Sequence, residues 1–325
     1  MADLQSLAER LRALPGVRAK ADIGLVAEVL GDGDWYAGPG DDGAVLPDGP
    51  GAVVAGGEAI LPAFVAADPY GAGIAAVLAN VNDLAAMGAR PVALLDTVVG
   101  SEELTREVLR GMRWAAERYD VPIVGGHLTR TDGPPALSAF GIGRADRLLS
   151  ATAAAPGQVL VLGCCLEGEM RADFPFFRSF AQRGDRLAGD VRLLADLAAS
   201  GAAVAAKDVS MAGLVGSLAM LLEPGRLGVP LDLDALPVPD GVPLADWLGC
   251  FPAYAFLLTT PPERLADCLA GFAGRGLTAA AIGELDDTGE VRLARGGERV
   301  TVFDLRREGI THLRRHDGTS GIVIH

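Results

Sequence analysis

Acidic residues stand at the predicted ends of several helices and strands of this 325-residue chain, namely Asp41, Asp42, Glu58 and Asp83. Carboxylate oxygens from separate elements, with phosphate oxygens completing the coordination shell, are the ligands from which Mg²⁺ sites are built. A bare carboxylate is costly to bury, so each acid must be paired, solvated or bound to a cation. The pattern therefore predicts a Mg²⁺ site, with Asp83 as one of its ligands.

The same acids also have ordinary structural interpretations. Asp83 could cap a helix or pair with a nearby arginine, and Asp42–Gly43 could form a hairpin turn. Asp208 precedes a predicted helix that runs through Leu221, where it could simply be the N-cap. The residue types alone leave these alternatives open.

Two lysines form a second candidate set. Of the 28 lysine and arginine residues, only Lys20 and Lys207 are lysines. Because the chain uses arginine at all other basic positions, we hypothesise that these two positions need a compact ammonium group. The alternative is that the two lysines are there by chance. Lys20 lies in a connector between two predicted helices, and Lys207 directly precedes Asp208.

A glycine pair follows the strand predicted over residues 121–124. Gly125 and Gly126 would let backbone N–H groups approach an anion or a nucleobase closely. The next residue, His127, could contact a phosphate or the substrate, although a lone histidine is more often structural. This segment is a predicted part of the binding site.

The elements that position these residues alternate between helix and strand. Apolar residues at helical spacing lead to Gly88, which should end the central helix, and Ser101 should cap the next helix. A bend at Gly38–Pro39 precedes the first acids. Helices are predicted over residues 4–14, 22–30, 76–88, 101–119, 191–200 and 262–276, and strands over 52–55, 93–99, 121–124, 136–142, 158–162, 201–206, 256–260 and 278–282. An alanine-rich stretch, residues 144–156, predicts a boundary between domains 1–150 and 151–325.

A loop over residues 167–185 holds four of the ten phenylalanines: Phe174, Phe176, Phe177 and Phe180. The cluster is either a satellite core or an aromatic lid over a substrate. The four cysteines fit neither a disulfide framework nor zinc spacing, and we expect them to be buried as small apolar residues.

Composition limits the classes of partner. A net charge of −14 argues against nucleic acid and acidic membranes, and a bound polyanion would need a cation for neutralisation. No apolar run is long enough to span a membrane. The first sixteen residues form an amphipathic charged helix rather than a signal peptide, so we expect a cytoplasmic protein.

Four motifs, in order, carry a family resemblance: GDDGAVL at 40–46, NDLAAMGARP at 82–91, IVGGHLT at 123–129 and DVSMAGL at 208–214. Together they resemble the superfamily of aminoimidazole ribonucleotide (AIR) synthetase, thiamine-monophosphate kinase, selenophosphate synthetase and the hydrogenase-maturation dehydratase. The spacing is most similar to selenophosphate synthetase. Val17 and Ala19, however, stand where its reactive cysteine or selenocysteine is expected, which argues against selenide chemistry.

The resemblance implies an α+β fold of two AIR-synthase-like domains. The N-terminal half-barrel sheet would dimerise, the C-terminal domain would be an α/β sandwich, and ATP would lie in the groove between them. By the same resemblance Asp42, Asp83 and Asp208 hold Mg²⁺ with ATP, and Lys20 contacts the phosphates. Glu58 stands where relatives usually carry aspartate, and its longer side chain shifts the oxygen.

The leading hypothesis is a homodimeric enzyme that uses ATP and Mg²⁺ to transfer a phosphoryl group to a small molecule. Lys20, Asp42 and Asp208 are the predicted catalytic residues. Lys207 and the glycine N–H groups assist, and Asp41 and His127 contact the nucleotide. The alternatives are a non-catalytic nucleotide-binding scaffold subunit of a neighbouring enzyme, or a structural dimer whose acids are solvated caps.

Overall fold

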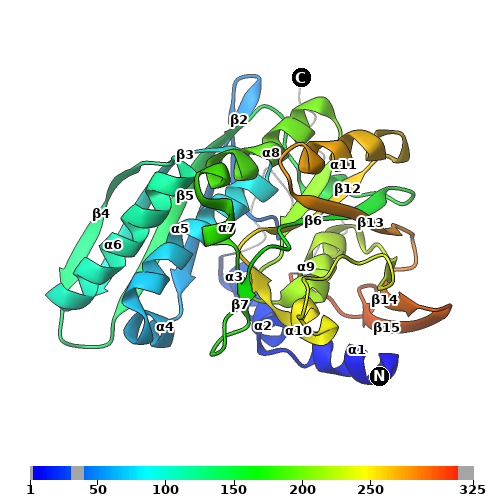
Figure 1. The fold of residues 1–325 in the computed structure, drawn as a ribbon, viewed down its shortest axis with the longest axis horizontal. Helices are drawn as coiled ribbons and strands as arrows, with labels where there is room; N and C mark the ends of the chain where they lie inside the picture. Colours follow the sequence, from blue (N-terminus) through cyan, green and yellow to red (C-terminus); the bar gives the residue numbers. More distant parts are fainter. Residues whose placement is uncertain (1–2, 31–39, 314–325) are drawn as a thin grey trace.

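The computed structural model describes residues 3–30 and 40–313, so the bend predicted at Gly38–Pro39 lies outside the described residues. The chain forms two halves that each combine helices and sheets (Figure 1). Among the described helices, none combines the length and apolar character needed to cross a lipid bilayer.

The first half is built on a five-stranded sheet in the order β1-β2-β5-β3-β4. Its strands are β1 (Ala44–Asp48), β2 (Gly51–Ile60), β3 (Arg90–Gly100), β4 (Ile123–Arg130) and β5 (Ala136–Ala145). Neighbouring strands are antiparallel except β3 and β4, which are parallel because helix α6 (Glu102–Tyr119) crosses over between them. The sheet is open, in agreement with the predicted half-barrel.

Helices α4 (Pro62–Ala67) and α5 (Pro69–Ala86) lie with α6 along this sheet. Asp68 caps α5 by accepting a hydrogen bond from Gly71 N at 2.9 Å. At Gly73 an added Cβ would lie 2.1 Å from Val108 O, so only glycine allows α5 and α6 to approach this closely. As predicted, Gly88 closes this helix: α5 ends at Ala86, Met87 is its C-cap, and Gly88 follows with a φ of +72°.

The described residues of the second half form three sheets. The largest is antiparallel, in the order β13-β6-β12-β9, with β6 (Val159–Cys164), β9 (Ala205–Asp208), β12 (Ala255–Thr260) and β13 (Thr278–Glu284). The others are β10-β14-β15, with β10 (Val229–Asp232), β14 (Glu290–Arg295) and β15 (Glu298–Asp304), and β11-β8-β7, with β7 (Glu169–Met170), β8 (Phe176–Arg178) and β11 (Phe251–Pro252). Its helices are α7 (Phe180–Arg183), α8 (Leu187–Ser200), α9 (Gly213–Leu222), α10 (Leu244–Gly249) and α11 (Leu265–Ala273).

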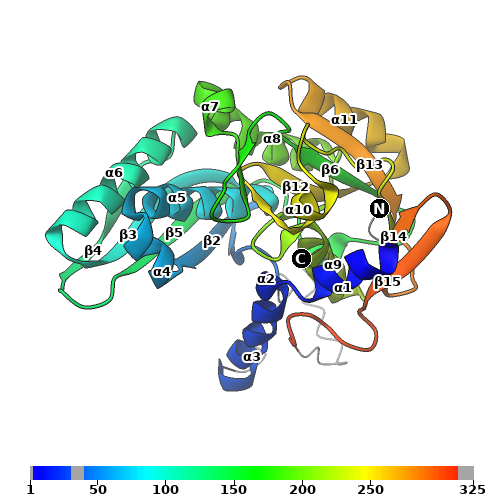
Figure 2. The same ribbon diagram turned by 60° about the horizontal axis from the view of Figure 1, so that its bottom comes forward.

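The N-terminal helices are α1 (Leu4–Arg12), α2 (Pro15–Ala19) and α3 (Gly24–Leu30). Helix α1 packs against the second half, as Figure 2 shows, although the predicted boundary assigns it to the first. Its residues Leu7 and Leu11 are buried in one core cluster with Leu214 and Trp247. The start of the chain is therefore anchored on the half that is farther along the sequence.

The two halves share a continuous core. Val77 and Val81 of α5 belong to the same buried cluster as Val191 and Leu194 of α8. At the junction, Asn82 Nδ2 donates a hydrogen bond to the carbonyl oxygen of Ala253 at 3.3 Å. This shared core fixes the end of α5 close to β9. The prediction that the four cysteines are buried is confirmed, and all are free thiols.

Candidate active site

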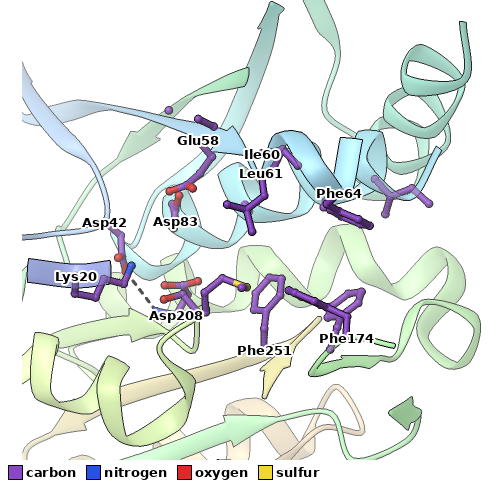
Figure 3. Close-up of a pocket in the computed structure, with 18 of the residues that line it drawn as sticks. Lys20, Asp42, Glu58, Ile60, Leu61, Phe64, Asp83, Phe174, Asp208 and Phe251 are labelled. Carbon is purple, nitrogen blue, oxygen red and sulfur yellow. Dashed lines mark hydrogen bonds between the residues drawn. The ribbon is translucent and has the colours of Figure 1, made fainter. Parts of the chain in front are cut away.

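Three aspartates from distant parts of the chain meet where the two halves join. Asp42 lies two residues before β1, Asp83 is near the C-terminal end of α5, and Asp208 is the last residue of β9. One carboxylate oxygen from each lies within 4.8 Å of the others (Figure 3). Hard oxygen donors at this separation form a group that could hold a divalent cation.

Lys207 is buried within this group. Its Nζ donates hydrogen bonds to Asp42 Oδ1 and, at 3.3 Å, to Asp208 Oδ1. The side chains of Lys207, Asp42 and Asp208 are only 5%, 6% and 4% exposed. The backbone N–H of Asp208 also donates to Asp42 Oδ2 at 3.3 Å. The lysine thus supplies a fixed positive charge between two of the acids.

One lysine does not neutralise the acids around it. Burial raises the pKa of Asp42 to about 7, with Lys207 opposing this rise and Asp208 adding to it. Burial also raises the pKa of Asp83 well above its usual range, and the nearby charges of Asp208, Asp42 and Glu58 raise it further. Burial works against the charge on Lys207, but Asp42 and Asp208 outweigh it and raise the lysine pKa. A cation bound here would relieve the remaining repulsion.

The structural alternatives for these acids do not hold. The N-cap position of α9 is Ala212, so Asp208 does not cap the helix. The β1–β2 turn falls at residues 48–51, so Asp42 is not in the hairpin turn. Asp83 does not cap α5, because it lies near the end of this helix and the N-cap is Asp68. It is not paired with an arginine either: among the described residues, the positive charge that lowers its pKa is that of Lys207.

A cavity of about 630 Å³ opens beside the aspartates and runs between the two halves. Lys20 and Glu58 line its acidic end together with the three acids (Figure 3). The far end is lined by aromatic rings, among them Phe64, Phe174 and Phe251. A cavity of this size is typical of small-molecule sites, which bury most of the ligand.

Family comparisons agree with this architecture. The model for the AIR synthase related protein N-terminal domain matches residues 40–145, and the model for the C-terminal domain matches residues 167–295. Uncharacterized protein sll0787 of Synechocystis is 35% identical over 316 residues, which cover 95% of this chain and 98% of that protein. The chain belongs to the AIR synthase-related family. The resemblance predicted from the four motifs is thereby confirmed.

Two solved structures with the AIR synthase-related fold are similar to this chain. The match to T. maritima PurL complexed with ADP has a TM-score of 0.71 at 20% identity and covers 87% of this chain and 48% of PurL. The match to AaThiL complexed with AMPPCP and TMP has a TM-score of 0.64 at 19% identity and covers 86% and 95%. This chain thus spans about half the length of PurL. The predicted two-domain α+β fold is confirmed.

The other acids of the predicted set take different positions. Glu58 lies outside the tight group of three, although burial and the charge of Asp208 raise its pKa and Lys20 opposes the rise. Asp41 accepts hydrogen bonds from Ser150 Oγ at 2.6 Å and from Ala151 N at 2.8 Å. Its carboxylate therefore links the residues before β1 to residues 150–151. A direct contact of Asp41 with the nucleotide stays a prediction.

Gly125, Gly126 and His127 are not brought to the cavity within one chain. The prediction that the glycines follow a strand is wrong, because β4 includes them and pairs Gly126 with Asp96. A Cβ at Gly126 would lie 2.6 Å from Asp96 O, so glycine is needed for this close approach. His127 is exposed on this edge strand. Its contact with a nucleotide stays a prediction.

The phenylalanines of the loop over residues 167–185 have two different environments, the core and the cavity. Phe177 is buried in the core, whereas Phe174, Phe176 and Phe180 line the cavity. Several lining groups were not predicted from the sequence, among them Arg171, Phe251 and the ring of Phe64. Phe64 lies about a hundred residues before the loop, and no periodic pattern links them.

We expect Mg²⁺ affinity to rise with pH across neutrality. Because the pKa of Asp42 is about 7, this carboxyl must lose a proton to bind a cation at lower pH. The dissociation constant measured by calorimetry should fall about tenfold between pH 6 and pH 8. Affinity that does not change over this range would contradict the burial of Asp42 in a metal site.

The stability of the metal-free protein should change in the opposite direction. A folded-state pKa above the unfolded value favours the protonated form, so the contribution of Asp42 is largest at low pH and is lost as pH rises through about 7. The melting temperature in EDTA should therefore fall between pH 6 and pH 8. Saturating Mg²⁺ should reduce this fall.

Proposed function

We propose that this protein is an enzyme that uses ATP and Mg²⁺ to phosphorylate, and so activate, a small-molecule acceptor. The observation that carries the proposal is the convergence of Asp42, Asp83 and Asp208 on one cavity between the halves. Solved structures of the same fold hold ADP or AMPPCP, which supports a nucleotide as the ligand.

The donor set fits Mg²⁺. The three aspartates offer hard carboxylate oxygens. Burial, and after it the charges of neighbouring carboxylates, raises the pKa of Asp42 and of Asp83, and Lys207 only partly opposes this rise. When bound, Mg²⁺ would neutralise charge on the nucleotide phosphates. Lys207 holds Asp42 and Asp208 in position through its two hydrogen bonds.

The chemistry is a single displacement at phosphorus. The acceptor oxygen forms a bond to the γ-phosphorus as the bond to the bridging oxygen breaks, ADP leaves with that electron pair, and the acceptor hydroxyl releases its proton. Lys20 lines the acidic end of the cavity, where its ammonium would stabilise charge on the moving phosphoryl group. The protein thus contributes position and electrostatics, as phosphoryl transfer requires.

A nucleotide turnover assay tests this function. Purified protein should form ADP, or AMP if two phosphates are released, from ATP in a Mg²⁺-dependent reaction that candidate acceptors accelerate. The Lys20→Met variant should bind Mg-AMPPCP but turn over more slowly. Nucleotide binding without any turnover, across a panel of small alcohols, amides and carboxylates, would instead favour the scaffold function.

We also propose a homodimer formed through the face of the five-stranded sheet that lies opposite α5. Along β1 and β5, buried Val45 and Ala139 alternate with exposed Leu46 and Phe140, which are 58% and 45% exposed. Apolar side chains of this size on one sheet face are typical of an interaction surface.

We expect Phe140→Glu to convert this dimer into a monomer, because a charge would be buried in the interface. Light scattering coupled to size-exclusion chromatography measures the mass directly. Leu128→Glu is the matched control, since Leu128 is 56% exposed but lies beside α6 residues. A wild-type protein that is already monomeric would refute the proposed dimer.

A further inference from the structure

One wall of the aromatic end of the cavity is formed by alternate side chains of strand β8. In β8, Phe176 and Arg178 line the cavity, whereas Phe177 between them packs against Trp247 in the core. Strand β11 pairs with β8 in parallel and places Phe251 opposite Phe176. The two rings are stacked, with centroids 5.2 Å apart. This wall is therefore a fixed aromatic surface.

A second pair of rings at this end comes from both halves. Phe64 of α4 and Phe174 of the loop are nearly parallel, with an interplanar angle of 5° and centroids 6.1 Å apart. The Arg171 guanidinium lies 5.5 Å from the centroid of Phe64. Both rings are only partly buried, so a flat ligand would remove more apolar surface from water.

The charged side chains at this end are already paired. Arg171 binds Asp68 at 2.9 Å and Asp173 at 2.6 Å, and Arg178 binds Glu169. A phosphorylated sugar would compete with Asp68, Asp173 and Glu169 for these arginines, and a purine would bring polar edge atoms against phenylalanine rings. An uncharged apolar ring incurs neither cost.

The aromatic end and the acidic end are parts of the same cavity. Residues of α5 line it at helical spacing, namely Tyr70, Gly71, Ile74, Ala75, Ala79 and Asp83. Asp83 is thirteen positions after Tyr70, which corresponds to about 20 Å along the helix. The small residues between them leave a channel that joins the two ends.

We propose that the aromatic end binds the acceptor through an uncharged aryl group, or a similarly flat apolar group. The acceptor is then an aryl-alkyl compound whose chain carries the nucleophilic oxygen toward the aspartates (Figure 3). This inference rests on the proposed phosphoryl transfer, to which it adds the substrate class.

Saturation-transfer NMR on the full chain, with Mg²⁺ and AMPPCP present, tests the inference. The probe is 3-phenylpropan-1-ol, with ribose 5-phosphate and adenosine as competitors. The probe should bind, and neither competitor should displace it. Phe174→Ala and Phe251→Ala should each weaken probe binding about tenfold, because each removes one ring face. The matched control, Phe303→Ala, removes a partly buried ring of β15 outside the cavity and should leave probe binding unchanged.

Displacement of the probe by adenosine would overturn the inference, because the aromatic end would then hold the nucleobase. Equal probe binding by wild type and both cavity variants would also overturn it, provided that thermal melts show all proteins folded. The dissociation constant of Mg-AMPPCP, measured in the same samples, separates the two proposals. Absent nucleotide binding refutes the phosphoryl transfer, whereas ring-dependent probe binding would still establish the aromatic site.

Discussion

Replacing Asp83 by asparagine should lower Mg²⁺-dependent ATP turnover at least about 100-fold, since loss of groups that merely orient a ligand already costs about 10- to 100-fold. The Asp83 side chain is buried and belongs to the three-aspartate group, and asparagine keeps its shape while removing the charge. A steady-state ADP assay at several Mg²⁺ concentrations measures the effect.

The same substitution should stabilise the metal-free protein. Burial and like charges raise the pKa of Asp83 in the folded protein, so this residue lowers the free energy of unfolding as pH rises above its ordinary, unfolded-state pKa. The melting temperature of Asp83→Asn in EDTA at pH 8 should exceed that of wild type, and added Mg²⁺ should raise it less. The matched control for turnover is Asp96→Asn, which replaces a buried acid of β3 outside the cavity. Unchanged turnover in Asp83→Asn would refute the metal role.

Replacing Lys207 by methionine should destabilise the metal-free protein by about 3 kcal/mol or more, because removing one partner of a buried ion pair leaves an uncompensated charge. The lysine is 5% exposed and binds two carboxylates that are as deeply buried. Urea denaturation in EDTA measures this loss. Mg²⁺ should restore part of the lost stability, since a cation would replace the ammonium.

A double-mutant cycle isolates the interaction. Adding Asp42→Asn to Lys207→Met should recover much of the lost free energy of unfolding, because the carboxylate left unpaired is removed. The control is Lys20→Met, which removes the other lysine of the chain from a partly exposed position and should cost less than about 1 kcal/mol. If Lys207→Met were as stable as wild type in EDTA, Lys207 would not be the internal counter-charge.

Local sequence signals predicted the caps and ends of the helices correctly. Ser101 caps α6, accepting a hydrogen bond from Leu104 N, and Gly88 ends α5, because caps and helix ends depend on neighbouring residues. The four motifs, in their order along the sequence, indicated the family. That resemblance implied that Asp42, Asp83 and Asp208 lie together, as they do in the structure.

Features that depend on tertiary contacts could not be predicted. The glycines of β4 look like a loop, but pairing with β3 and the close approach of Asp96 extend the strand through them. The amphipathic pattern of α1 indicates that one face of the helix is buried, but it does not indicate what covers that face. In the structure this is the second half of the chain. The contact between Phe64 and Phe174 likewise joins residues far apart in the sequence.

The most direct test of the account is the position of a bound metal. Crystals of the full chain grown with Mn²⁺ and AMPPCP should show an anomalous peak between the carboxylates of Asp42, Asp83 and Asp208, with the triphosphate beside it. A peak elsewhere in the chain, or nucleotide bound with no metal at these three side chains, would contradict the account.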